Sequence, residues 1–298
     1  MTDIKTNGVK AWVLAARPKT LTGAAAPVLV GGALAFRLAS MRPDMVQIPE
    51  LPWIPFLLTL AFALVMQVEA NFVNDYFDFK KGSDRDDRLG PERACAQGWV
   101  TPSAMKRALA ITALAALGVG LPLICYGGWE MLGVGILCLI FCWLYTTHLS
   151  HLGLGDLLVV VFFGIVPVVF TCFVITRAMP LEAWVMGCAM GLATDCLLVV
   201  NNYRDINQDR ISGKRTLIVM VGKKFGRMLY LLCGCVAAVT VGVFYNPWSA
   251  LLFIYLALHI VTYRSMGRLD GRELNQVLGA TARNIFIFGV LTALSVIL

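Results

Sequence analysis

The stretch Leu157–Thr176 reads LLVVVFFGIVPVVFTCFVIT and contains no charged residue. At about 1.5 Å per residue, a helix of this length covers a hydrocarbon core of about 30 Å. The whole chain shares this character, since its 298 residues are 58% hydrophobic and only 14% charged. A soluble domain carries roughly a quarter charged residues, because its surface must face water. The sequence therefore predicts an integral membrane protein that crosses the bilayer several times.

Working outward from this stretch, the hydropathy pattern predicts further apolar spans on both sides. Each span is expected to be a helix, because lipid offers no partner for free backbone N–H and C=O groups. Residues 1–19 contain no apolar run, so we expect no cleaved signal peptide. The predicted fold class is an all-α membrane protein with nine transmembrane helices, at 20–40, 52–74, 105–126, 129–147, 156–176, 182–203, 226–246, 248–264 and 280–298.

The positions of Lys and Arg predict the orientation. With a cytoplasmic N-terminus, 22 of the 25 basic residues fall on the cytoplasmic side, and the other side holds only Arg37, Arg42 and Arg177. The positive-inside rule therefore places the N-terminus in the cytoplasm and the protein in the cytoplasmic (inner) membrane. The net charge of +7 suits anionic lipid and an anionic substrate, so we expect no nucleic-acid partner. The nine cysteines show no Cys-x-x-Cys or Cys/His spacing, which argues against zinc or iron–sulfur sites.

Acidic residues are concentrated in two short stretches. Eight of the eighteen fall at 75–92 and 205–209, each at the cytoplasmic end of an apolar span. In the first stretch, Asn71 and Asp75 are four residues apart, Asp75 and Asp78 three, and Asn74 and Asp78 four. In the second stretch, Asn201, Asp205 and Asp209 follow one another at intervals of four residues. Either set shares one helical face, where like charges repel unless a cation neutralises them. Hard oxygen ligands suit Mg²⁺, and the interleaved Lys and Arg suit phosphate oxygens. The pattern predicts a diphosphate site bridged by magnesium.

Both stretches contain the Asn-x-x-x-Asp pattern, at Asn71–Asp75 and at Asn201–Asp205. This repetition favours a four-helix unit used twice, followed by a final helix, with the two acidic clusters facing each other.

At these residues the sequence resembles the UbiA-type intramembrane prenyltransferases. In that family an Asn-Asp-x-x-Asp stretch and an Asp-x-x-x-Asp stretch bind Mg²⁺ and prenyl diphosphate. They match here as Asn74-Asp75-x-x-Asp78, continued by Asp84, and as Asp205-x-x-x-Asp209. The resemblance covers nearly the whole chain. It implies one domain, 1–298, with nine helices around a central cavity and a cytoplasmic cap formed by loops 71–107 and 201–227.

Several local strings resemble one branch, the 1,4-dihydroxy-2-naphthoate polyprenyltransferases of menaquinone synthesis. They include Lys80-Lys-Gly-Ser-Asp84, Arg88-Leu-Gly-Pro-Glu-Arg93 and Gly213-Lys-Arg-Thr-Leu217. This branch implies transfer of a polyprenyl group from polyprenyl diphosphate to 1,4-dihydroxy-2-naphthoate, with loss of CO₂ and diphosphate. The loop 146–151, Thr-Thr-His-Leu-Ser-His, departs from the Gly/Pro-rich stretch that is typical there. Acceptor recognition is therefore not carried over in detail.

The resemblance also implies roles for single residues. The expected magnesium ligands, which are also the catalytic residues, are Asp75, Asp78, Asp205 and Asp209, with Asp84 as a further ligand. The expected substrate-binding residues are Arg17, Asn71, Asn74, Arg88, Arg93, Tyr145, Asn201, Asn202, Lys214 and Arg215.

Other functions stay open at this stage. Another acceptor, such as 4-hydroxybenzoate, homogentisate or a glyceryl phosphate, would require the same acidic clusters. A transporter of divalent cations or organic anions would also hold carboxylates, although transporter sites lie near the bilayer midplane. The sequence does not fix the prenyl chain length, the wall that holds the prenyl tail, or the roles of Asp195, His148 and His151.

Overall fold

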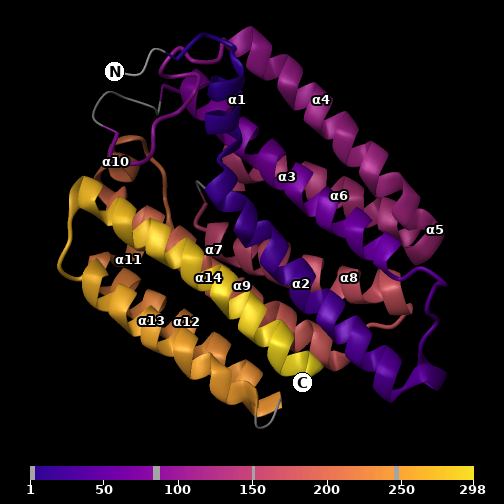
Figure 1. Ribbon diagram of the computed structural model, residues 1–298. Helices are drawn as coiled ribbons and strands as arrows, with labels where there is room; N and C mark the ends of the chain where they lie inside the picture. The colour runs from indigo at the N-terminus through magenta and orange to yellow at the C-terminus, as the bar shows by residue number, and fades with distance from the viewer. Residues whose placement is uncertain (1–3, 83–87, 150–151, 245–247) are drawn as a thin grey trace.

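The computed structural model describes residues 4–82, 88–149, 152–244 and 248–298, and every regular element within these ranges is a helix. The longer helices run side by side through one bundle (Figure 1). They are α2 (Pro18–Met41), α3 (Trp53–Lys80), α4 (Pro102–Gly120), α6 (Glu130–Thr147), α8 (Val166–Thr176), α9 (Leu181–Arg204), α12 (Lys223–Phe244), α13 (Leu252–Met266) and α14 (Leu274–Ile297).

Short helices connect or extend the long ones. A five-residue π-helix, Val161–Ile165, joins α7 to α8, and a 3₁₀ turn joins α4 to α5. The short α-helices are α1 (Val9–Ala16), α5 (Ile124–Gly127), α7 (Gly155–Val160), α10 (Ile206–Ile211) and α11 (Leu217–Val221), and the 3₁₀ turns are Pro43–Met45, Leu121–Leu123, Trp248–Leu251 and Gly271–Glu273.

Eight helical segments of the described chain are long and apolar enough to cross a membrane. They confirm a multi-pass membrane protein and overlap eight of the nine predicted spans. The remaining span, predicted at 248–264, is the 15-residue α13. A helix of this length covers only about 22 Å, less than the hydrocarbon thickness of about 30 Å. A ninth crossing at α13 therefore stays a prediction.

Small residues let the central helices approach closely. On α9, a Cβ at Gly191 would lie 2.5 Å from the carbonyl oxygen of Val160, and on α2 a Cβ at Gly31 would lie 2.5 Å from that of Val168. In lipid, such close contacts supply packing that the hydrophobic effect does not provide between helices. The α7–α8 segment is thus clamped between α9 and α2.

The helix lengths bring the two acidic stretches to one end of the bundle. The 28 residues of α3 span about 42 Å, so its last turns, with Asp75 and Asp78, extend beyond a hydrocarbon core. Helix α9 ends at Arg204, directly before Asp205. Helices α1, α10 and α11 lie at this same end, whereas α14 ends at the opposite one (Figure 1).

Replacing Gly191 by Ala should destabilise the protein by about 1–3 kcal/mol, because the new methyl group collides with the backbone of Val160. The matched control is Gly118→Ala on α4, where a Cβ meets nothing within 4 Å. Since Ala favours a helix over Gly, the control should be neutral or stabilising. Thermal unfolding of both variants in detergent measures the difference. Equal melting temperatures would contradict the close α7–α9 contact.

Candidate functional site

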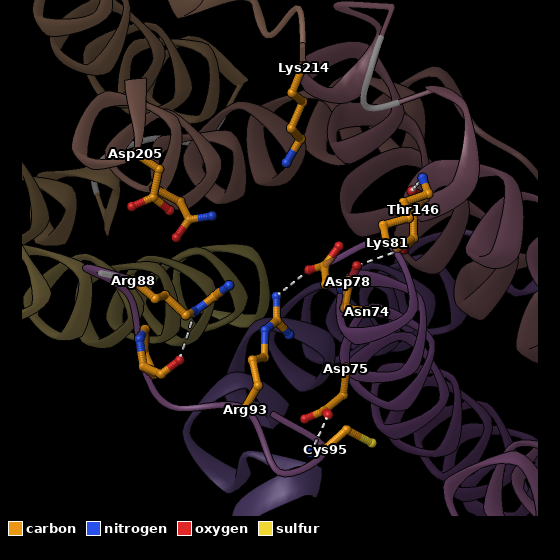
Figure 2. A network of polar contacts seen from close by, with 12 residues as sticks. Asn74, Asp75, Asp78, Lys81, Arg88, Arg93, Cys95, Thr146, Asp205 and Lys214 are labelled. Carbon is orange, nitrogen blue, oxygen red and sulfur yellow. Dashed lines mark hydrogen bonds and ion pairs between the residues drawn. The ribbon is translucent and has the colours of Figure 1, made fainter. Parts of the chain in front are cut away.

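A cavity of about 900 Å³ lies inside the bundle, with its polar end between α3 and α9. Figure 2 shows Asp78 and Arg93 on one side of this end, facing Asp205 and Lys214 on the other. The structure thus brings together most of the residues expected from the sequence. Those that line the cavity are Arg17, Asn74, Asp78, Arg88, Arg93, Tyr145, Asn201, Asp205, Asp209 and Lys214.

On the α3 side, the predicted ligands are held by neighbouring elements. The Asp78 carboxylate pairs with Nη2 of Arg93 at 2.9 Å. The Oδ1 atom of Asn74 accepts a hydrogen bond from the Thr146 hydroxyl of α6 at 2.6 Å. Nearby, Lys81 donates to the carbonyl oxygens of Thr146 and Thr147. These bonds tie the end of α3 to the end of α6 and fix the positions of Asn74 and Asp78.

Asp75 has a different position from the one predicted for it. Its side chain is fully buried and does not line the cavity. Its two carboxylate oxygens accept hydrogen bonds from the backbone N–H groups of Ala94 and Cys95, at 2.9 and 2.8 Å. Its oxygens hold the loop that carries Arg93, and its role as a magnesium ligand stays a prediction.

Asn71 also supports the site from behind. It is buried and donates to the carbonyl oxygen of Ala16 at 2.8 Å and to the Thr20 hydroxyl at 3.0 Å. These bonds span the junction of α1 and α2, where Arg17 adopts a left-handed conformation with φ 52°. For a residue other than glycine this conformation is uncommon and is maintained by its surroundings. Asn71 thus helps to aim Arg17 into the cavity.

Some predicted residues lie elsewhere. Asn202 is buried beside a small neighbouring pocket, and Arg215 is exposed and does not line the cavity. Asp195 is buried on α9, with one carboxylate oxygen 4.0 Å from the sulfur of Cys233, and it does not line the cavity. His148 is exposed and contacts the Thr147 hydroxyl. Asp84 and His151 lie outside the described residues.

On the other side, the predicted stripe of Asn201, Asp205 and Asp209 is confirmed. The amide of Asp205 donates to the carbonyl of Asn201, and that of Asp209 to the carbonyl of Asp205, at 3.0 and 2.8 Å. The spacing of one residue per turn thus continues past the end of α9. All three side chains line the cavity.

Arg204 organises this stripe, and the sequence argument assigned it no role. Its buried guanidinium donates two hydrogen bonds to the Asp205 carboxylate, at 2.7 and 2.6 Å, and one to Asn201 at 2.6 Å. A fourth bond, at 2.7 Å, reaches Asn275 of α14. The available signal was an Arg next to an Asp at a helix end. Adjacent residues do not share a helical face, so the spacing rule gave no reason to pair them.

Asp209 lacks a full set of partners. Its Oδ2 atom is buried without a hydrogen-bond partner among the described residues, and Lys214 Nζ lies 4.0 Å from Oδ1. Burial, reinforced by the Asp205 and Asp78 carboxylates and opposed by Lys214, raises the pKa of Asp209 from 3.8 to about 6. A carboxylate in this position binds a cation favourably, because the cation supplies the missing neutralising charge.

Arg17 shows the opposite deficit, because it has too little negative charge around it. Burial and the positive charges of Arg93 and Arg88, opposed by Asp75 and Asp78, lower the pKa of Arg17 from 12.5 to about 9. Its side chain is 22% exposed, facing the cavity, and stays protonated at neutral pH. Its Nη2 atom lies 4.0 Å from the Asp75 carboxylate. An anion in the cavity would stabilise this cluster of arginines.

The two deficits fit a magnesium diphosphate. Within the described ranges, no three Asp, Glu, His or Cys side chains lie close enough to hold a metal ion by themselves. Mg²⁺ is held in proteins by one or two carboxylates, several waters and phosphate oxygens rather than by an all-protein cage. The oxygens of Asn74, Asp78, Asn201, Asp205 and Asp209 fit that donor set.

Comparison with known proteins gives full-length relatives. The chain is 32% identical to the 1,4-dihydroxy-2-naphthoate octaprenyltransferase of Escherichia coli, covering 100% of this chain and 98% of the relative. It is 37% identical to the enzyme of the same name from Mycobacterium tuberculosis, covering 95% of both chains.

Solved structures share the fold. A UbiA homologue from Aeropyrum pernix K1 superposes with a TM-score of 0.70 at 16% identity, covering 92% of this chain and 97% of that one. Another, from Archaeoglobus fulgidus bound to DMAPP and Mg²⁺, gives 0.64 at 13% identity, covering 96% and 98%. Residues 45–288 match the UbiA prenyltransferase family. Since this match takes in most of the chain, the protein belongs to the UbiA prenyltransferase family.

Proposed function

We propose that this chain transfers a polyprenyl group from polyprenyl diphosphate to 1,4-dihydroxy-2-naphthoate, giving a demethylmenaquinone, CO₂ and diphosphate. The observation that carries the proposal is the cavity, in which carboxylates and arginines meet at one end of an apolar interior. A diphosphate head and a hydrocarbon tail require this combination. The full-length similarity to 1,4-dihydroxy-2-naphthoate octaprenyltransferases supports the choice of acceptor.

Magnesium would be held by Asp78, Asp205 and Asp209, with Asn74 and Asn201 beside them. Bound there with the diphosphate, it would supply Lewis-acid neutralisation of the leaving group. The chain's own residues prepare this position. Arg204 orients Asp205, Thr146 orients Asn74, and one Asp209 oxygen has no hydrogen-bond partner in the part of the chain that the structure describes.

The basic residues bind the diphosphate. Arg17, Arg88, Arg93 and Lys214 line the same end of the cavity. Their charges are fixed before the substrate arrives, so they stabilise the negative charge that develops as the C–O bond breaks. Breaking this bond leaves an allylic cation on the prenyl group and both bonding electrons on the diphosphate.

Aromatic rings surround the position just below the polar end. Tyr145 and Phe141 are four residues apart on α6, and Phe162 lies with its ring centroid 4.9 Å from that of Phe141. All three line the cavity. The faces of aromatic rings attract cations, and the site excludes much of the water that would capture an allylic cation. These rings therefore protect the prenyl cation until the acceptor ring attacks it.

For the membrane arrangement, we propose nine crossings, with α13 as the short eighth one, and a cytoplasmic N-terminus. The basic residues near the site support a cytoplasmic active end, by the positive-inside rule. The 22 basic residues on one side and three on the other follow only from an odd number of crossings. The chain would form a single domain, 1–298. The diphosphate of one substrate and the polar groups of the other would enter the site from the cytoplasm.

Replacing Asp209 by Asn should lower kcat/KM at least about 100-fold, because the lost carboxylate weakens stabilisation of the leaving group. Stability should be unchanged, since Asn removes a buried charge that lacks a full set of hydrogen-bond partners among the residues described. The control is Asp270→Asn, whose exposed carboxylate pairs with Lys223 at 3.1 Å outside the cavity. Prenyl transfer should also stop in EDTA and return with Mg²⁺. A fully active Asp209→Asn enzyme would refute the proposed magnesium site.

The acceptor is tested with 1,4-dihydroxy-2-naphthoate labelled with ¹⁴C in its carboxyl group. Attack at the carboxylated ring carbon leaves no proton to lose, so aromaticity returns only when CO₂ leaves. We expect one labelled CO₂ per prenyl group transferred. With 4-hydroxybenzoate, attack at a free ring position would expel a proton and keep the carboxylate. Label retained in the lipid product, or a preference for 4-hydroxybenzoate, would rule out this acceptor but would not affect membership of the family.

The orientation is tested with reporters at two positions. Green fluorescent protein inserted after Gly213, which lies in an exposed turn, should fluoresce, because the reporter folds in the cytoplasm. The same reporter fused to Leu298 should be dark, and alkaline phosphatase fused there should be active. Fluorescence from both positions would mean an even number of crossings and would show that α13 does not cross the membrane.

A further inference from the structure

The cavity extends far beyond its polar end. Along α6, residues that line the cavity run from Tyr145 at the polar end to Met131. These positions are fourteen residues apart, so this wall is about 21 Å deep. The facing walls come from α3, α4, α5 and the α7–α8 segment, through apolar side chains such as Phe62, Leu121, Ile124 and Phe170. A long hydrocarbon chain fits this apolar interior.

Gly135 is the point on this wall where no side chain intrudes. It lines the cavity, and a Cβ built on it would meet no atom within 4 Å. Any side chain at this position would therefore extend into the free space of the cavity. Two residues away, Gly133 also has nothing within 4 Å of its Cβ direction, but it is exposed on the outer face of α6 and does not line the cavity.

The depth of Gly135 relates to the prenyl chain. It lies ten residues from Tyr145, which is about 15 Å along the helix. An isoprene unit contributes four chain bonds of ~1.5 Å, and hence extends by about 5 Å. With its diphosphate at the polar end, a prenyl chain would pass Gly135 near its third isoprene unit. A shorter chain ends before it.

We propose that Gly135 is a specificity-determining residue, which admits long prenyl chains into the passage between α4, α6 and α8. The inference rests on the proposed function and adds to it the wall along which the tail lies. Gly120 also lines the cavity, and a Cβ there would lie 3.2 Å from the Phe62 ring, so this part of the wall is tightly packed. A large side chain at Gly135 would occupy space through which the tail passes.

The test compares Gly135→Phe with Gly133→Phe, each supplied with Mg²⁺, 1,4-dihydroxy-2-naphthoate and either geranyl or octaprenyl diphosphate. We expect Gly135→Phe to use geranyl diphosphate at close to the wild-type rate and to lose at least about tenfold in kcat/KM with octaprenyl diphosphate. Gly133→Phe should be unchanged with both. Thermal unfolding reports whether each variant is folded.

A folded Gly135→Phe enzyme with an unchanged octaprenyl-to-geranyl ratio overturns the inference, because the tail would then leave the site by another route. If Gly135→Phe does not fold, Gly135→Val decides in the same way, with a smaller loss expected for octaprenyl diphosphate alone. A wild-type enzyme that transfers neither prenyl group would instead refute the proposed function. The two failures are therefore distinguishable.

Discussion

The polar end of the cavity depends on the buried carboxylate of Asp75. Its two hydrogen bonds from Ala94 and Cys95 fix the segment that follows the first acidic stretch. Hydrogen bonds to a charged group contribute about 1.5–3 kcal/mol each, and leaving the buried carboxylate without them would be strongly unfavourable. From this anchored segment Arg93 reaches Asp78, and Asn275 of α14 binds the carbonyl of Leu89. One buried acid thus holds the arginines over the cavity.

The site is preorganised but incompletely neutralised. Arg204 with Asp205, and Arg93 with Asp78, form direct pairs that fix each carboxylate. Asp209 and Arg17, by contrast, are displaced in pKa in opposite directions, one lacking a cation and the other an anion. A site in which every charge had a direct partner would be more stable, but it would bind a metal diphosphate less tightly. The strain of unmatched charge remains in the free protein and is relieved when a metal diphosphate enters.

Sequence reasoning recovered the features that follow from composition and period. Apolar length predicted the long helices, and four-residue spacing predicted that Asn201, Asp205 and Asp209 share one face. It did not foresee that the Asp75 side chain turns away from the cavity, because spacing groups residues on a face without telling which part of that face meets the cavity. Arg204 was missed because its side chain folds back onto its neighbour, a contact made by the end of a helix. Arg215 follows Lys214 directly, yet only Lys214 reaches the cavity, since one step in the chain redirects the side chain.

The π-helix at Val161–Ile165 has a consequence for how this protein can change. Its wide turn accommodates one residue more than an α-helix would, and both Phe162 and Phe163 line the cavity. Deleting one residue here would restore an ordinary helix and leave the helix after it nearly in phase, because the wide turn absorbs the extra residue. A deletion within α8 would instead rotate everything after it by about 100° and turn it from the cavity towards other neighbours. The π-helix is therefore a place in this wall where the chain length can change by one residue while Pro167 and Phe170 keep facing the cavity.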